Sequence, residues 1–168
     1  MNPQGLAVAL CLILSLCGCA IGRSTPQPTT YVIEIPAPVA RVARRPERLS
    51  MGRVRVAPAF AGRSLVFRLD AARYAAAVYN ALIAAPGDLL GAGMASWLDQ
   101  AGPFASVAQP GSYKGATHVL EAVVTELYGD YRRSGSAAAV VTVQFRLVDL
   151  TSVTPQVRLE QTIGRRLE

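Results

Sequence analysis

Cysteine is missing from all but the first nineteen positions of this 168-residue chain, where Cys11, Cys17 and Cys19 lie. A disulfide framework or a thiolate metal site needs cysteines in the folded part of a protein, so we expect neither beyond Cys19. Histidine is nearly absent as well: His118 is the only one, and it opens a predicted strand among apolar neighbours. We expect a structural or surface role for it, in a domain that folds by burying apolar side chains.

Long apolar runs are also missing, because none approaches the roughly 18 residues that a membrane-spanning helix needs. The longest, LAVALCLILSL at positions 6–16, carries no charge. Its eleven residues cover only about 16 Å as a helix, which suits the apolar region of an export signal. The preceding MNPQG contains no Lys or Arg, unlike the usual start of such a signal. A buried N-terminal helix or strand is the alternative.

Catalytic motifs are equally scarce. The chain has no G-x-S-x-G elbow, and no cysteine follows Cys19 to act as a nucleophile. Glu121 and Glu126 lie an odd number of residues apart on a predicted strand, so they face opposite sides. The Gly91–Gly93 step lacks the third glycine of a dinucleotide loop and lies inside a predicted helix, where close packing explains it better. The sequence therefore predicts no enzyme, no metal site and no cofactor.

Most of the charged residues in the sequence are arginines. The chain has a single lysine, Lys114, and a net charge of +6 that falls entirely on the part after Cys19. Nucleic acid is not an expected partner, since an exported protein rarely meets it. A contact with anionic lipid headgroups is one interpretation of the stretch RVARRPERLSMGRVRV, and a solvated loop in an arginine-rich protein is the other. Its arginines are Arg41, Arg44, Arg45, Arg48, Arg53 and Arg55.

Residues Leu16, Cys17, Gly18 and Cys19 resemble the lipobox of bacterial lipoproteins, with signal cleavage between Gly18 and Cys19. In such lipoproteins the cysteine thiol is joined to diacylglycerol and the freed amine is acylated, palmitate being a typical chain. Each buried methylene contributes about 0.8 kcal/mol, so three acyl chains hold a protein on the membrane permanently. Ala20 follows the cysteine instead of the Asp that retains lipoproteins at the inner membrane. The resemblance implies lipid attachment at Cys19 and the periplasmic face of the outer membrane.

Three regions follow from these features. Positions 1–18 are a lipoprotein signal peptide, 19–30 a lipidated tether with Pro26 and Pro28, and 31–168 a single small domain. Pro86, Asp88 and the stop at Gly102-Pro103 predict a helix over 86–101, with an apolar stripe from Leu90 to Leu98. Apolar alternation and turn residues predict strands at 31–38, 53–58, 64–69, 73–80, 104–107, 117–131, 137–150 and 156–163.

The last three predicted strands are separated by short, hairpin-like turns. Consecutive strands with such spacing indicate an antiparallel meander. One main helix is available to cover its apolar face. The predicted fold class is therefore α+β, an antiparallel sheet meander with one main helix packed on one face.

The whole layout resembles the ABC-type transport auxiliary lipoproteins. The lipobox is followed by a short strand that ends in proline (YVIEIPAP) and by a G-x-V-x-V-type strand (GRVRVAP). An aromatic-basic strand (SLVFRL), the lead into the helix (YNALIAAPGDLL), SWLDQAGPF and LEAVVTELYGD complete the order. The resemblance spans nearly all of the chain after the signal. It rests on the order and spacing of these segments together.

The resemblance implies an accessory component of an MCE-type ABC system, which transports lipids between the two membranes of a Gram-negative envelope. It implies docking of a periplasmic MCE-domain protein, itself joined to an ABC permease and ATPase. Family members usually continue into a C-terminal helix, whereas this chain stops at GRRLE. We therefore expect an uncovered part of the sheet, available to a partner or to a homo-oligomer.

Two other function classes stay open at this point. An outer-membrane assembly lipoprotein of another envelope machine, such as a pilotin or an activator of a cell-wall synthase, also carries a small α+β domain on a tether. A periplasmic enzyme or solute-binding protein fits less well, since a solute binder normally needs a cleft between two lobes and the chain provides one short domain.

Overall fold

The computed structural model describes residues 26–133 and 135–168. The predicted signal peptide, the lipid-attachment residue Cys19 and the first half of the predicted tether lie outside the described residues, so these stay predictions. Within the described part of the chain, no helix is long and apolar enough to cross a membrane.

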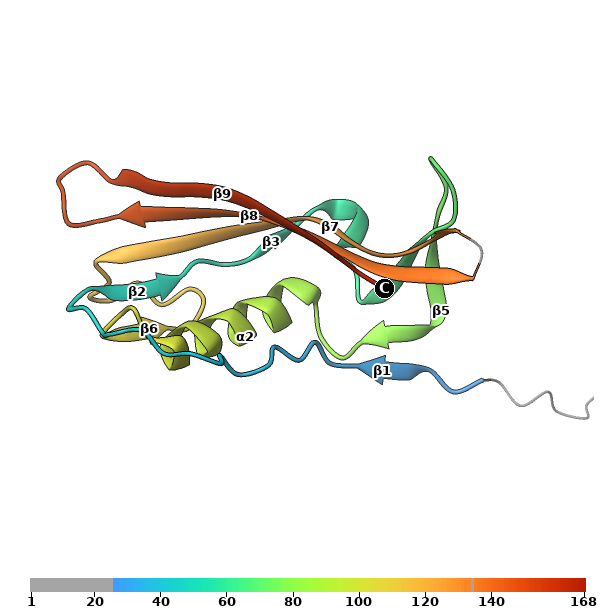
Figure 1. The fold of residues 1–168 in the computed structure, drawn as a ribbon, viewed down its shortest axis with the longest axis horizontal. Helices are drawn as coiled ribbons and strands as arrows, with labels where there is room; N and C mark the ends of the chain where they lie inside the picture. Colours follow the sequence, from blue (N-terminus) through green and yellow to red (C-terminus); the bar gives the residue numbers. More distant parts are fainter. Residues whose placement is uncertain (1–25, 134) are drawn as a thin grey trace, which may run out of the picture.

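The described residues form one sheet of nine strands and one α-helix packed against it (Figure 1). The helix is α2 (Pro86–Ala101), and a 3-10 turn, η2 (Pro58–Phe60), lies between β3 and β4. The strands are β1 (Thr29–Tyr31), β2 (Arg48–Met51), β3 (Arg55–Val56), β4 (Ser64–Arg68), β5 (Tyr74–Leu82), β6 (Ser106–Ala108), β7 (His118–Arg133), β8 (Ser136–Asp149) and β9 (Gln156–Leu167).

Strand β7 is the axis of the sheet. On one side β8 pairs with it in antiparallel fashion along most of its length, and β9 pairs antiparallel with β8. On the other side β2, β3 and β4 pair with successive parts of β7, and all three run parallel to it. β6 extends the sheet beyond β2, while β5 and then β1 extend it beyond β4.

The predicted antiparallel meander is therefore wrong as a description of the sheet, which is mixed. The meander is limited to β7, β8 and β9. Parallel neighbours need a crossover connection, and between β4 and β7 the chain makes it through β5, α2 and β6. Alternating apolar and polar residues predict that a segment is extended, but they carry no information about the direction of its neighbour.

Helix α2 has the bounds that the sequence predicts, 86–101. Pro86 occupies its first turn, and Gly102 ends it at φ 63°, where the Gly102 N–H donates to the Leu98 carbonyl. The core lies between α2 and the sheet. Its fully buried members are Met51, Val54, Ala95, Ala122 and Val124, and the partly buried residues packed on them include Leu90, Met94, Leu98, Leu120, Leu127, Val143 and Phe145.

The strands of the N-terminal part differ from the prediction. The predicted strand 53–58 is limited to β3, and β2 was not predicted. The β2 residues Leu49, Ser50 and Met51 are all nearly inaccessible, and a strand that is buried on both faces shows no alternation. The predicted strand 31–38 overlaps β1 only at Tyr31, although Ile33 and Ile35 are half-buried while Val32 and Glu34 are exposed.

Candidate binding surface

In the described part of the chain, no group of three or more His, Cys, Asp or Glu residues could hold a metal ion. His118 is half-buried, with Nδ1 3.0 Å from the Thr117 hydroxyl oxygen and its ring 6.3 Å from that of Phe104. Arg45 and Glu47 line the same groove of about 380 Å³. These contacts agree with the structural role predicted for His118.

The six arginines proposed for lipid contact are all exposed, but they serve different parts of the fold. Arg44 donates to the carbonyl oxygens of Asp99 and Ala105, at the C-terminal end of α2 where a cation is favoured. Arg48 donates to the Gly115 carbonyl at 2.6 Å. These two guanidinium groups therefore hold loops in place.

Arg53 and Arg55 lie on the other side of the sheet. Both flank Val54, whose side chain packs under α2. Because successive side chains of an extended segment point to opposite faces, the Arg53 and Arg55 side chains point away from the helix. Arg41 and Arg45 belong to the segment before β2, near the C-terminal end of α2, where the Val42 N–H donates to the Ala101 carbonyl. The stretch thus presents arginines on both sides of the sheet, and a membrane contact by all six together stays a prediction.

An exposed apolar surface lies on the helix side of β8 and β9. Cross-strand rows show how it arises. Val124 on β7 is 0% exposed beneath α2, its neighbour Val143 on β8 is half-buried, and Ile163 on β9 is 36% exposed. A second row runs from Leu120 through Leu147 to Leu159 in the same way. Helix α2 covers the first strand of each row but does not reach the last.

We call this surface the open face, and define it by Val143, Phe145, Leu147, Leu159 and Ile163. Every residue of β9 is exposed, and the strand forms the outer edge of the sheet on that side (Figure 1). The sequence predicted the strand at 156–163, which the structure extends to Leu167. It could not show that α2 stops short of this strand, since that depends on how the helix lies across the sheet.

An apolar groove separates the open face from the helix. It has a volume of about 160 Å³ and is lined by Ile35, Met94, Trp97, Leu98, Leu120 and Phe145. Ile35 reaches it from the N-terminal segment, which packs against α2 where Gly93 leaves room: a Cβ there would lie 2.7 Å from Ile35 Cδ1. The groove and the open face together form one continuous apolar surface.

Asp149 closes the turn that joins β8 to β9. Its carboxylate is 4% exposed and accepts hydrogen bonds from the Thr151 hydroxyl (2.6 Å) and backbone N–H (2.8 Å). Arg158 Nη2 forms an ion pair with it at 2.7 Å. These contacts, with the Thr151 hydroxyl first, lower the pKa of Asp149 well below its usual value. Arg158 becomes the partner of Asp149 only through the hairpin, so no local sequence pattern indicates this ion pair.

Acid should weaken the fold through Asp149. The folded pKa lies below the unfolded value of about 4, so the unfolded chain binds more protons in acid and stability falls as the pH drops below about 5. We expect Asp149→Asn to be less stable than the parent at pH 7, and the difference to shrink toward pH 2. Urea unfolding at several pH values measures this. A difference that stays constant from pH 7 to pH 2 would contradict it.

Comparisons with known proteins bear on the fold. No family model and no curated protein matches the chain. The solved structure of protein XCC0632 from Xanthomonas campestris, described as DUF330, is similar with a TM-score of 0.64 and 15% sequence identity, covering 84% of this chain and 76% of that one. The fold is shared. An uncharacterized protein of known structure is similar to the same degree, with a TM-score of 0.63 and 17% identity over 85% of this chain and 81% of its own.

Proposed function

We propose that the protein is an auxiliary lipoprotein of an MCE-type ABC transport system. In this role Cys19 carries the lipid that anchors the chain at the periplasmic face of the outer membrane. The folded domain docks the periplasmic MCE component, and the system transports lipid between the two membranes. The open face carries the proposal, because it is the apolar surface that a protein partner would cover.

Two physical arguments support a protein partner at the open face. Contiguous apolar surface of this kind on a folded domain marks an interaction site, since leaving it in water is unfavourable. Strand β9 also leaves one row of backbone N–H and C=O groups unpaired within the described sheet, and such an edge accepts a further strand. A partner that covers the open face and adds a strand to β9 would bury the apolar side chains and pair the free backbone groups.

The order of sequence segments and the shared fold add further support. The lipobox, the proline-terminated strand and the later segments follow the order seen in transport auxiliary lipoproteins. The similarity in fold to a DUF330 structure covers 84% of this chain.

The lipid anchor is tested by Cys19→Ala. Because the thiol is the point of lipid attachment, we expect the variant to move from the membrane fraction to the soluble fraction while the domain stays folded. Cell fractionation with circular dichroism of the purified protein measures both. Cys17→Ala is the matched control and should remain in the membrane fraction, since Cys17 is removed with the signal. A membrane-bound Cys19→Ala protein would contradict the anchor.

The docking surface is tested by the double variant Leu159→Asp, Ile163→Asp. Two carboxylates on the open face would have to be desolvated by a covering partner, so crosslinking to the MCE component should be lost while the fold is kept. Val153→Asp, at a fully exposed position in the β8–β9 turn, is the matched control. Undiminished crosslinking of the double variant would place the docking site elsewhere. Capture of a secretin or a cell-wall synthase instead would favour the alternative assembly role.

A further inference from the structure

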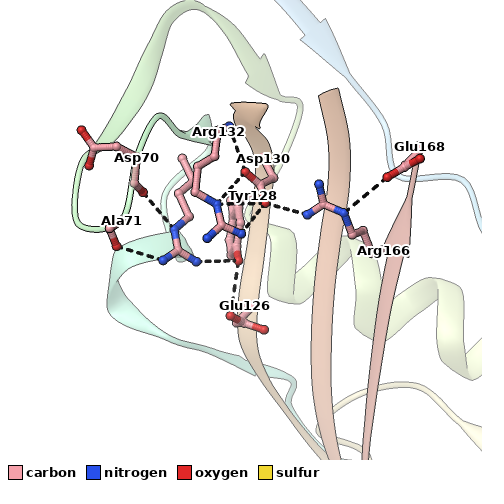
Figure 2. Close-up of polar contacts among 9 residues, drawn as sticks. Asp70, Ala71, Glu126, Tyr128, Asp130, Arg132, Arg166 and Glu168 are labelled. Atoms are coloured by element: carbon pink, nitrogen blue, oxygen red, sulfur yellow. Dashed lines mark hydrogen bonds and ion pairs between the residues drawn. The ribbon is translucent and has the colours of Figure 1, made fainter. Parts of the chain in front are cut away.

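Two arginines bind one buried carboxylate near the C-terminal end of β7, and a third arginine, Arg133, lines the same hollow. Asp130 is 1% exposed, and Arg132 Nη2 and Arg166 Nη1 lie 2.7 Å and 2.6 Å from its Oδ2 (Figure 2). The Arg132 backbone N–H and Nε donate to Oδ1 as well. Arg132 and Asp130 share a face because they are two residues apart on a strand, whereas Arg166 comes from β9, across β8.

The position of this cluster depends on a bulge in β7. The register with β8 shifts between Val124 and Glu126, which moves the alternation of side chains by one residue. Val124 faces α2, and after the bulge Leu127 faces it too, so Asp130 falls on the side away from the helix. The cluster is therefore separate from the open face. Ala138 pairs with Asp130 on β8, and its small side chain leaves room for the guanidinium groups.

A polar hollow of about 340 Å³ opens among these residues, lined by Asp130, Arg132, Arg133 and Arg166. The lining holds three guanidinium groups and one carboxylate, and the Glu168 carboxylate lies 3.8 Å from Arg166 Nε, so at least one positive charge is in excess. The Arg132 and Arg166 side chains are 42% and 35% exposed although the carboxylate is inaccessible. Hydrogen bonds from Arg132 and then Arg166 lower the pKa of Asp130, so it stays ionised and holds both guanidinium groups at any physiological pH.

We propose that this arginine pocket binds a phosphate monoester group. Asp130 engages only part of each guanidinium group, so Arg132 Nη1 and Arg166 Nη2 remain as donors, and Arg133 adds a third guanidinium. Guanidinium groups fixed in orientation bind phosphate oxygens in a bidentate manner. The charge of a phosphate monoester, about −1.5 to −2 at neutral pH, is opposite in sign to the excess charge of the pocket. Asp130 is a positioning residue here, since it contacts the arginines and not the ligand.

A purely structural ion network is the alternative, but it explains the pocket less well. Arg166 Nε also lies 3.8 Å from the Glu168 carboxylate. Glu168 is not among the residues that line the hollow. A structural network tends to balance its charges, whereas this one leaves guanidinium groups half-exposed around a solvent-filled hollow. The ligand could be supplied as a lipid with a terminal phosphate or as a soluble phosphate ester, and the two share the same chemistry at the pocket.

The test uses the full chain carrying Cys19→Ala, so that an acyl anchor does not itself bring the protein to membranes. One arm titrates inorganic phosphate, followed by NMR shifts of the arginine side chains, with chloride as the comparison ion. The other arm sediments phosphatidylcholine vesicles with and without phosphatidic acid. Arg133→Gln is the test variant, because Arg133 is outside the Asp130 ion pairs and the fold should be kept, which thermal unfolding checks. Arg146→Gln, an exposed arginine 3.9 Å from Glu121, is the matched control.

Binding to either probe that Arg133→Gln weakens about tenfold, and Arg146→Gln leaves unchanged, would support the pocket. Phosphate binding without vesicle binding would indicate a soluble ester, and binding to phosphatidic acid vesicles would indicate a lipid. The proposal fails if neither probe binds, if chloride binds equally well, or if both variants weaken binding alike. None of these outcomes depends on the MCE partner, so this experiment tests the pocket independently of the proposed function.

Discussion

Met51→Ala is expected to lower the free energy of unfolding by about 2–5 kcal/mol, the range for truncating a fully buried methionine. Met51 is 0% exposed at the end of β2, where it pairs with Leu120 of β7 and packs in the cluster with Val54, Ala95 and Val124. Removing its side chain loses the transfer free energy of the buried atoms and leaves a cavity between the sheet and α2 that the surrounding backbone cannot fill.

Urea denaturation followed by circular dichroism measures this change. Val153→Ala is the matched control, because Val153 is fully exposed in the turn between β8 and β9, and it should stay within about 0.5 kcal/mol of the parent. A loss below about 1 kcal/mol for Met51→Ala would mean that β2 does not hold the core together in solution. Because β2 lies within an arginine-rich stretch, this measurement tests whether that stretch contributes to the core.

Gly87→Ala is expected to destabilise the protein by about 1–3 kcal/mol, the cost of forcing extra volume into a packed site. In a solvent-exposed helix the same substitution stabilises by about 1 kcal/mol. The sign reverses here because the new Cβ would lie 2.7 Å from the Val54 carbonyl oxygen and 3.4 Å from Val56 Cγ2. The first turn of α2 would have to move away from the backbone that connects β2 and β3.

Gly62→Ala is expected to have the opposite effect and to stabilise the protein. Within the described residues, nothing lies within 4 Å of a Cβ at Gly62, and its φ is not positive. Alanine there should stabilise by about 0.4–1 kcal/mol, since it reduces the freedom of the unfolded chain. Thermal unfolding of the two variants compares them directly. Stabilisation by both would show that α2 packs less closely on the sheet than the structure indicates.

The candidate surfaces were only partly predictable from the sequence. The sequence predicted the strands at 137–150 and 156–163 that carry the open face. The groove beside it was not predictable, because Ile35, Trp97 and Phe145 come from three distant segments. The arginine pocket was missed, although Asp130 and Arg132 carry a local signal: a carboxylate and a guanidinium two residues apart on a strand share a face.

The sequence by itself determined the features that depend on near neighbours. Helix α2 could be placed over 86–101 because Pro86, an apolar stripe and Gly102 act within a few residues of one another. The long strands β7 and β8 followed from side-chain alternation, and the predicted lipid anchor at Cys19 follows from a four-residue motif. Each of these depends on local backbone preference or a short recognition sequence.

Only the tertiary structure decided which strands run parallel, where β2 lies and what surrounds Asp130. The parallel pairing of β2, β3 and β4 with β7 depends on the crossover through α2, and Arg166 reaches Asp130 only because β8 and β9 fold back as a hairpin. The bulge after Val124 then sets the side of the sheet on which Asp130 lies. These are contacts between residues far apart in the chain, and no local pattern specifies them.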